Sequence, residues 1–483
     1  MKQLTSIAVV AAEVAPWSKT GGLGDVCGAL PKALAALGHR VMTISPRYKE
    51  YPDAWDTGVR ALVYLFGQHH QVAFFHSKVD GVHNVFVDHP CFHRGGIYGD
   101  ASGPYGDNLF RFALLSRAAI EAAANVPLDG VPMGEDLVFH ANDWHTGLLP
   151  LYLEAVYRPA GRFAGAGTVL GIHNAGHHGS APAHDFAGLD ISARWWPAAD
   201  FDGRLNPLKA GITLARKIVA VSPTYAREVT GPLGFGLEGV FASRGADLLG
   251  ILNGVDDSWR PETDTHIAAN FSSENLAGKA ACKAALQAEL GLPVRADVPI
   301  LGVVARLDHQ KGIDLVEAAT PWLMRHDVQL VMLGSGSSAL EGFFRQAERT
   351  WPEKVRGWVG FNEGLAHRIE AGSDLFLMPS RFEPCGLNQM YSLRYGTLPV
   401  VHATGGLADT VETFDPLSNR GTGWAFKSFS VEAFVEAMGW ALYTWRNHPS
   451  AWKGMQLRGM TQDFSWERSA QAYARVYEAS RPR

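Results

Sequence analysis

The chain has 483 residues, with 43 Lys and Arg against 48 Asp and Glu, so its formal net charge is −5. Hydrophobic residues make up 47% and charged residues 19%, which excludes a disordered chain, and the length suggests two or three domains. The acidic balance argues against a nucleic-acid-binding role, and no apolar run approaches the ~20 residues of a membrane helix. The four cysteines form no CxxC pair, which indicates a reducing compartment and argues against a zinc site.

The first half of the chain opens with a strand, a glycine-containing loop and a helix. We expect the strand at 6–12, the helix at 26–37 with a stop at Gly38, and a second strand at 40–45. A helix and four short strands follow, at 108–123, 85–87, 137–140, 168–172 and 217–221. Strands that alternate with helices through short connections predict a doubly wound parallel sheet.

The same alternation begins again after Asn253. The expected strands cover 299–304, 329–333, 355–359, 375–378 and 398–401, and the expected helices cover 312–320 and 340–350. We therefore predict an α/β protein of two Rossmann-like domains with a hinge at 249–255. The domains are expected at 1–250 and 251–460, and a helix in 461–483 is expected to pack back on the first. Ligands of such sheets bind at the carboxyl ends of the strands, so we expect both domains to line one cleft that closes on its ligand.

A loop with three glycines, KTGGLGD at 19–25, follows the first predicted strand. Glycines let backbone N–H groups approach an anion closely, and the next helix presents its positive end. The spacing matches neither GxGxxG nor the phosphate-binding P-loop. Phosphate binding and a plain strand–helix turn therefore remain equally open for this loop.

Polar residues also follow two other strands of the first half. Asp143 lies in the segment NDWHT after the strand at 137–140, and His173 and Asn174 end the strand at 168–172. A strand end is where a site is expected, although Asp143 is also suited to a helix N-cap. The histidines of this region have no matching carboxylates, so hydrogen bonding to a polar substrate is favoured over metal binding.

In the second half, Arg306 and Lys311 come just after a predicted strand that ends at 304. Two cations at a strand end suit a diphosphate leaving group, with a solvated surface pair as the alternative. Glu383, in the segment SRFEPCGL, follows the strand at 375–378 and offers a carboxylate to sugar hydroxyls. Glycine loops at 334–336 and 404–409 follow two further strands.

Taken in order, the segments KTGGLGD, NDWHT, IHN, R-x4-K-G, SRFEPCGL and TGGL-x-DT resemble the bacterial glycogen synthases and plant starch synthases. The resemblance covers essentially the whole chain, and the phrases at 302–315, 354–361 and 381–391 are most similar to the soluble starch synthase II class. It implies the GT-B fold and a retaining enzyme of glycosyltransferase family 5. Such an enzyme transfers glucose from ADP-glucose to the non-reducing end of an α-1,4-glucan in starch or glycogen synthesis.

The resemblance also implies roles for individual residues. Those implied to be catalytic are Lys19, Asp143, His173, Arg306, Lys311 and Glu383. Those implied to bind substrate are Gly21, Gly22, Asp25, Tyr105, Asn174, Asn253, Gly334, Phe361, Cys385, Gly386, Leu387, Asn388, Thr404 and Gly405. Within these sets, Arg306 and Lys311 would neutralise the departing ADP, and Phe361 would stack on adenine. Glu383 is a candidate nucleophile on chemical grounds, whereas the resemblance implies that it binds the donor glucose.

Further expectations follow from the resemblance. No acidic pair of the DxD type ends a strand, so we expect no metal and no other cofactor. The expected partners are ADP-glucose and α-1,4-glucan or maltooligosaccharides, without nucleic acid or membrane, and association with other starch enzymes stays open. The expected compartment is the plastid stroma for a plant or green-algal chain and otherwise the cytoplasm, although no transit peptide precedes Lys2 and Gln3. The loop at 175–178 departs from the family pattern, so its acceptor contacts are not carried over.

Three alternatives remain beside this interpretation. The closest is another transferase of the same fold, a UDP-glucose enzyme or a glucan phosphorylase that would need a pyridoxal-phosphate lysine. A glucan-binding scaffold without activity is disfavoured by the intact set of Lys19, Arg306, Lys311 and Glu383. A nicotinamide dehydrogenase is disfavoured because no GxGxxG opens the first unit.

Overall fold

The computed structural model describes residues 4–482, so Lys2 and Gln3 lie outside the described part. The chain forms two compact units: one runs up to Gly254 and includes the segment from Ser465 onward, and the other is Val255–Phe464. The boundary falls inside the expected hinge, and the chain returns to the first unit for its last helix. Within the described range, no helix is both long enough and apolar enough to span a membrane.

The first unit is built on a nine-stranded sheet. Its spatial order is β14 (Leu248–Gly250), β13 (Lys217–Ala220), β9 (Gly167–Ile172), β8 (Val138–Asn142), β1 (Ser6–Val10), β2 (Arg40–Pro46), β5 (Val82–Asp88), β4 (Gln68–Val79) and β3 (Trp55–Leu65). The strands from β14 through β5 pair in parallel. The central strands β1 and β8 are buried almost throughout, which is why they read as short apolar runs.

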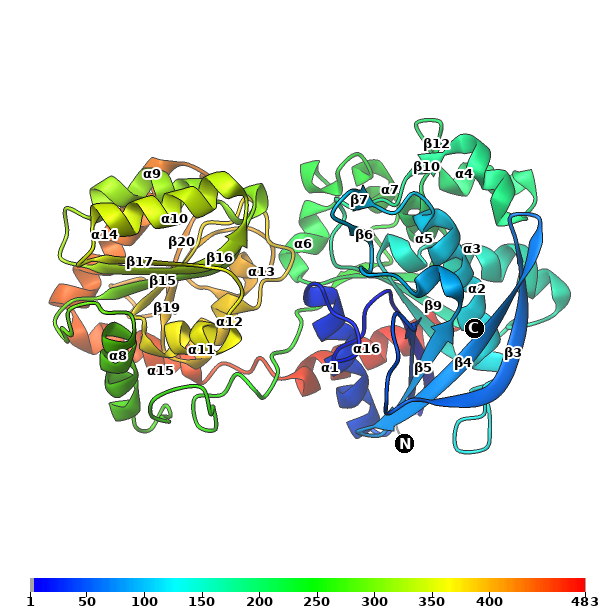
Figure 1. The fold of residues 1–483 in the computed structure, drawn as a ribbon, viewed down its shortest axis with the longest axis horizontal. Coiled ribbons are helices and arrows are strands. Elements are labelled where there is room, and N and C mark those ends of the chain that lie inside the picture. The colour runs from blue at the N-terminus through cyan, green and yellow to red at the C-terminus, as the bar shows by residue number, and fades with distance from the viewer. Residues whose placement is uncertain (1–3, 483) are drawn as a thin grey trace. The chain divides into compact units, whose positions relative to one another are not determined.

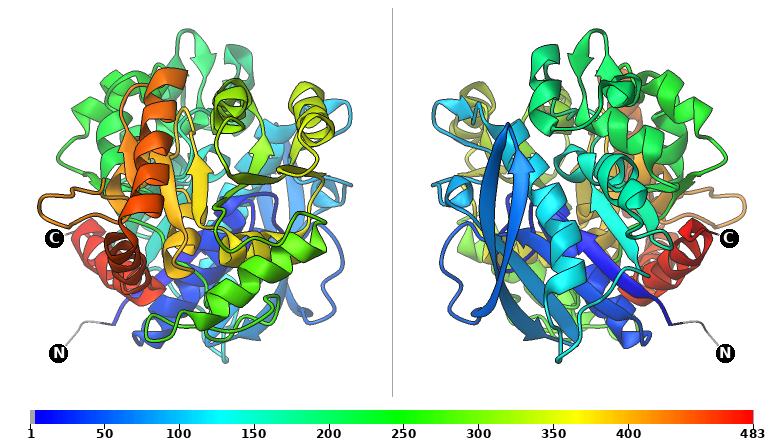
Figure 2. Two further views of the ribbon diagram at one scale, coloured as in Figure 1. Left: turned by 90° about the vertical axis from the view of Figure 1, so that its left-hand side faces the viewer. Right: turned by 90° about the vertical axis from the view of Figure 1, so that its right-hand side faces the viewer.

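The edge of this sheet differs from the prediction of a wholly parallel sheet. The long strands β3 and β4 pair antiparallel with each other, and β4 pairs antiparallel with β5. Both form the twisted hairpin seen in Figure 2. Neither strand is predicted from the sequence, because neither carries a long apolar run. Strand β3 alternates exposed with half-buried positions, and β4 is rich in polar residues.

Helices cover both faces of the first sheet. They are α1 (Gly22–Ala36), α2 (Asn108–Asn125), α3 (Leu148–Tyr152), α4 (Trp196–Ala199), α5 (Pro207–Leu214), α6 (Pro223–Glu228), α7 (Glu238–Ser243) and α16 (Trp466–Ser480). Buried residues recur every three or four positions along α1, so one face of this helix packs into the core. The last helix, α16, packs beside α1 (Figure 1), which joins the end of the chain to its beginning.

The second unit has a six-stranded sheet that is parallel throughout. Its order is β17 (Val355–Val359), β16 (Gln329–Gly336), β15 (Ile300–Leu307), β18 (Leu375–Met378), β19 (Leu398–His402) and β20 (Trp424–Phe426). Its helices are α8 (Ala277–Glu289), α9 (Ile313–Leu323), α10 (Ser338–Thr350), α11 (Glu363–Gly372), α12 (Asn388–Arg394), α13 (Gly405–Thr410), α14 (Val431–Asn447) and α15 (Pro449–Met460). Short bridged pairs complete the strands: β6 (Gly99–Asp100) with β7 (Gly103–Pro104), and β12 (Arg204–Leu205) with β10 (Ala181–Pro182) and β11 (Asp200–Phe201).

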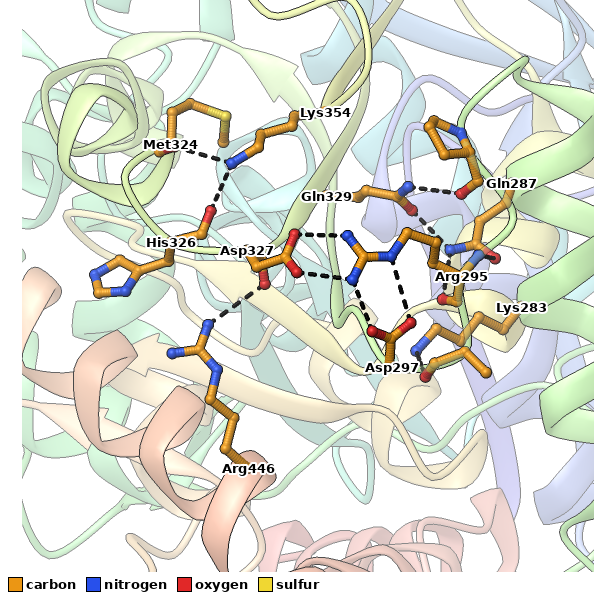
Figure 3. A network of polar contacts seen from close by, with 12 residues as sticks. Lys283, Gln287, Arg295, Asp297, Met324, His326, Asp327, Gln329, Lys354 and Arg446 are labelled. Carbon is orange, nitrogen blue, oxygen red and sulfur yellow. Dashed lines mark hydrogen bonds and ion pairs between the residues drawn. The ribbon is translucent and has the colours of Figure 1, made fainter.

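A polar network holds the amino-terminal edge of the second sheet (Figure 3). The Arg295 guanidinium pairs with Asp297 at 2.7 Å and with Asp327 at 2.9 Å, just ahead of β15 and β16. Lys354, which precedes β17, donates to the last carbonyls of the α9 turn at Met324 and His326. These contacts stabilise the amino-terminal edge of the sheet. The opposite, carboxyl-terminal edge is the one where ligands of parallel sheets bind.

Two element boundaries differ from the expected ones in ways that concern the candidate site. Helix α1 begins at Gly22 and not at Val26, so Gly22 and Asp25 lie in its first turn. Strand β15 extends to Leu307, so Arg306 lies inside the strand and not after it. Both extensions arise because backbone hydrogen bonds continue into glycine-rich or polar residues that carry no hydrophobic signal.

Candidate active site

The predicted residues fall into two groups, one at the carboxyl edge of each sheet. In the first unit most of them follow β1, β8 and β9, which are neighbours in the sheet, whereas Tyr105 follows β7 and Asn253 follows β14. In the second unit they follow or end β15, β16, β17, β18 and β19. Parallel strands bring their carboxyl ends to one edge, so residues far apart in the sequence meet there.

Glu13, which follows β1, is the centre of the first group. Its side chain is buried, and its carboxylate accepts hydrogen bonds from the backbone N–H and the hydroxyl of Thr20 and from the N–H of Gly21, the last at 3.2 Å. The Tyr98 hydroxyl donates to the same carboxylate. A buried acceptor therefore holds the KTGGLGD loop in one conformation at the start of α1.

Tyr98 connects this loop to the segment NDWHT. Its ring stacks on His145 with centroids 4.8 Å apart, and His145 packs against Trp144 at 4.2 Å. Burial raises the pKa of the Tyr98 hydroxyl well above its usual range and lowers that of His145 well below it. Both rings are therefore neutral at physiological pH and suited to packing and hydrogen bonding.

Asp143 occupies a strained position directly after β8, with φ at +54°. Its carboxylate does not cap the short helical turn that follows, so the N-cap interpretation is wrong. It accepts instead from the N–H groups of His173, at 2.7 Å, and Asn174, at 3.3 Å, after β9. Burial raises the pKa of Asp143 to about 7, against the lowering effect of these two hydrogen bonds.

The other predicted residues of the first unit surround this centre. His173 is held by Asn142, whose Oδ1 lies 2.9 Å from Nε2, and burial lowers the pKa of His173 to about 4. The Tyr105 hydroxyl accepts from the N–H of Gly96, so it is tied to the segment around Tyr98. The buried Asn253 has no hydrogen-bond partner for its Oδ1 among residues 4–482.

The second group is organised by an ion pair between Lys311 and Glu383. The Lys311 ammonium lies 2.9 and 2.7 Å from the two carboxylate oxygens, and the Ser380 hydroxyl donates to one of them at 2.9 Å. Glu383 is almost completely buried, whereas the Lys311 side chain is one-fifth exposed. The pair joins the carboxyl ends of the neighbouring strands β15 and β18.

Each of the three cations predicted to meet the diphosphate has an acidic partner. Lys19 pairs with Asp25 at 2.7 Å, Arg306 with Asp308 at 2.9 Å and Lys311 with Glu383. Lys19 and Arg306 are more than half exposed, so those two pairs are weak in water and exchange easily. The surface-pair alternative therefore fits the geometry of Arg306 but not that of Lys311.

The first residues of α13, which the sequence predicted as a glycine loop at 404–409, pack tightly against Glu383. A Cβ on Gly405, where φ is +45°, would lie 2.0 Å from the Glu383 carbonyl oxygen. The N–H of Gly406 donates to that carbonyl at 3.1 Å. Only glycine fits this approach, so the TGGL segment is a structural requirement for placing Glu383.

The remaining predicted residues lie around this centre. Asn388 donates to the Val304 carbonyl at 2.8 Å, so its side chain joins α12 to β15. Phe361 follows β17, and 89% of its side chain is exposed. Gly334 lies inside β16, because the strand continues to Gly336 and the loop predicted at 334–336 is not formed. Cys385, Gly386 and Leu387 precede α12, and Thr404 precedes α13. Among the described residues, no group of three or more His, Cys, Asp or Glu side chains is arranged to hold a metal ion.

Glu13 and Tyr98, which the structure places in the first group, are not predicted from the sequence. Glu13 interrupts an otherwise apolar run just before the glycine loop, which is an available signal for a buried functional carboxylate. Tyr98 carries no local signal, because its contact with Glu13 spans 85 residues.

Comparison with known families gives two matches. The family described as starch synthase catalytic domain matches residues 6–243, and the family described as glycosyl transferases group 1 matches residues 291–453. The chain is 47% identical to soluble starch synthase 1 of Solanum tuberosum over 99% of this chain and 79% of the relative. It is 49% identical to starch synthase 2 of Arabidopsis thaliana over 99% of this chain and 62% of that relative. Starch synthases of class 1 and of class 2 are therefore about equally similar to this chain.

Solved structures give the same result. The catalytic domain of starch synthase IV from Arabidopsis thaliana, bound to ADP and acarbose, superimposes with a TM-score of 0.88, with 32% identity and 99% of each chain covered. A sucrose-phosphate synthase from Thermosynechococcus elongatus shares the fold alone, with a TM-score of 0.60 and 18% identity over 98% of each chain.

Proposed function

The chain belongs to the starch synthase family, and we propose that it transfers glucose from ADP-glucose to the non-reducing end of an α-1,4-glucan. The predicted GT-B fold is confirmed by its structural neighbours. The observation that carries the proposal is the Lys311–Glu383 ion pair, which sets a cation beside a carboxylate at adjacent strand ends. A diphosphate and a glucosyl group need this combination side by side.

In this mechanism the cations stabilise the charge that develops on departing ADP. Lys311 and Arg306 act from the second unit, and Lys19 acts from the first. Fixed charges aimed at a leaving group are among the largest contributions to catalysis, with losses of about 10²- to 10³-fold when one is removed.

Glucose transfer retains the anomeric configuration, because donor and product are both α-glycosides. The bond from the anomeric carbon to the phosphate oxygen breaks, and a bond to the acceptor hydroxyl oxygen forms on the same face. The hydroxyl proton moves to the departing phosphate. Glu383 binds donor hydroxyls in this scheme: the contacts with Lys311 and Ser380 hold its carboxylate in place, and each oxygen keeps a lone pair for a further donor.

The first unit contributes further glucose-binding groups. Asp143, His173 and Asn174 are fixed by mutual hydrogen bonds. The buried Oδ1 of Asn253, which has no hydrogen-bond partner among residues 4–482, would accept from a substrate hydroxyl. With its pKa near 7, the Asp143 carboxyl is partly protonated at neutral pH and able both to donate and to accept. The reaction uses no metal and no other cofactor, because lysine and arginine supply the positive charge.

The relatives named chloroplastic or amyloplastic support a plastid location, and we propose the stroma. The proposed partners are ADP-glucose and the glucan chain. A UDP-glucose enzyme and an inactive scaffold are not favoured, because the similar proteins are starch synthases over nearly the full chain and the charged set is intact.

The test is glucose transfer to glycogen from ADP-glucose and from UDP-glucose in parallel, each with and without EDTA. We expect activity with ADP-glucose that EDTA does not change. Preference for UDP-glucose would overturn the donor, loss of activity in EDTA would overturn metal independence, and inactivity with both donors would favour the scaffold.

A further inference from the structure

Helix α14, in the second unit, presents two large aromatic side chains to solvent. Trp440 is 56% exposed and Tyr443 is 53% exposed. Their spacing of three residues puts them on one face of the helix. Together with Glu436 and Gly439 they line a hollow of about 390 Å³. The hollow lies on a helix that carries none of the residues of the candidate active site.

The fold does not require these rings. The buried face of α14 is made by other residues, Phe434, Met438, Ala441, Leu442 and Thr444, which pack into the core. Adjoining exposed apolar side chains provide a surface on which an apolar ligand face can be buried. The exposed Trp440 and Tyr443 rings are therefore available to bind a ligand.

The two rings are held in a defined arrangement. Trp440 and Tyr443 meet edge to face with centroids 6.2 Å apart, and Tyr443 also contacts the His448 ring at 5.4 Å. Gly439 has no side chain to fill the space between them. A Cβ at Gly439 would meet only the Trp322 ring of the neighbouring helix α9, at 3.9 Å (Figure 1). The hollow therefore has a shallow floor at Gly439, which the two aromatic rings border.

The chemistry of the hollow selects its occupant. Its volume lies within the roughly 300–1,000 Å³ of small-ligand pockets. The lining contains a carboxylate, Glu436, and no cation, which disfavours anionic ligands. Flat apolar rings beside a hydrogen-bond acceptor suit a neutral sugar, whose C–H face stacks on aromatics while its hydroxyls donate.

We propose that this α14 hollow is a second, non-catalytic binding site for α-1,4-glucan chains. The inference rests on the proposed function, which supplies a polymeric glucan as the acceptor. A chain held at α14 raises the effective concentration of neighbouring chain ends at the enzyme. The benefit is confined to long or branched acceptors, because a short maltooligosaccharide that occupies α14 offers no second end.

The test combines a binding readout with kinetics for three variants of the full chain. Trp440→Ala with Tyr443→Ala removes both rings. Gly439→Gln keeps the rings and adds a side chain to the hollow. It suits the fold because its Cβ would lie in ordinary van der Waals contact with the Trp322 ring, at 3.9 Å, and because glutamine favours helix. Trp55→Ala, a tryptophan 53% exposed on β3, is the matched control.

We expect native electrophoresis in gels containing glycogen to retard the wild type and the control more than the α14 variants. The apparent KM for glycogen should rise about fivefold or more in the α14 variants. The KM for ADP-glucose, the kcat and the kinetics with maltotriose should stay unchanged. Retardation and KM for glycogen equal to those of the wild type in both α14 variants would overturn the proposal. A change of oligomeric state on sedimentation would also overturn it, because the hollow would then bind a second copy of the chain.

The binding readout separates this inference from the proposed function. Active transfer with unaltered retardation contradicts the α14 site alone. Absent transfer from ADP-glucose, with retardation that still depends on the two rings, contradicts the proposed activity and supports the glucan site.

Discussion

The hydroxyl of Tyr477, in the last helix of the chain, lies 3.0 Å from Nδ1 of His140, in the centre of the first sheet. Both residues are buried, and 337 residues separate them in the sequence. The contact fastens α16 to β8, the strand that leads directly to Asp143. The end of the chain therefore supports the site built by its first half.

Replacing Tyr477 by Phe should lower the free energy of unfolding of the first unit by about 1–3 kcal/mol. The buried His140 ring would lose a partner, and its Nε2 already has none among the described residues. Urea unfolding at neutral pH measures the change. Tyr64→Phe, at an exposed position on β3, is the control and should leave stability unaltered. Equal stabilities of the two variants would contradict the role of the contact.

The first unit should lose stability as the pH falls below about 6.5. Burial lowers the pKa of His140 to about 3 and that of His173 to about 4, from an ordinary value of 6.5. Below pH 6.5 the unfolded chain binds protons that these folded histidines do not, so acid favours unfolding by about 1.4 kcal/mol per pH unit for each residue. Asp143 opposes this, because its raised pKa makes the folded state the better proton binder between about 4 and 7.

The variant His140→Gln measures how much one histidine contributes to this pH dependence of stability. Its free energy of unfolding should depend less steeply on pH between 6.5 and 4.5, by about 1.4 kcal/mol per pH unit. The exposed His184→Gln variant should keep the slope of the wild type. Parallel curves for the wild type and His140→Gln would show that His140 is protonated equally in both states.

Replacing Lys311 by Ala should lower kcat by about 10²-fold or more. The variant removes the cation proposed to face ADP and leaves Glu383 buried with only the Ser380 hydroxyl. Steady-state kinetics with ADP-glucose and glycogen measure the effect, with the exposed Lys453→Ala as the matched control. Activity within threefold of the wild type would remove Lys311 from the mechanism.

Replacing Glu13 by Gln should raise the KM for ADP-glucose about tenfold. The amide keeps the shape of the side chain but turns one acceptor into a donor opposite the N–H groups of Thr20 and Gly21, at a cost of about 1–3 kcal/mol. The loop that carries Lys19 would then lose its fixed conformation. Glu50→Gln, at an exposed position, is the control, and an unchanged KM in Glu13→Gln would mean that loop order does not matter for the donor.

The order of strands and helices could be predicted well where the chain is periodic and buried. The strand at 375–378 and the strand at 355–359 match the structure residue for residue. The antiparallel pair β3 and β4 could not be predicted, because half-exposed edge strands lack a continuous apolar signal. The roles assigned to the individual site residues stay predictions until kinetics test them.

By itself the sequence determined which residues stand at strand ends, since that depends on local hydrophobic patterning and glycine content. It did not determine their partners. The Glu13 contact with Tyr98, the pairing of Lys311 with Glu383 and the exposure of Trp440 were decided by the tertiary structure alone. The physical reason is that a side chain's contacts depend on how distant segments pack, and the chain encodes that packing through the whole core at once.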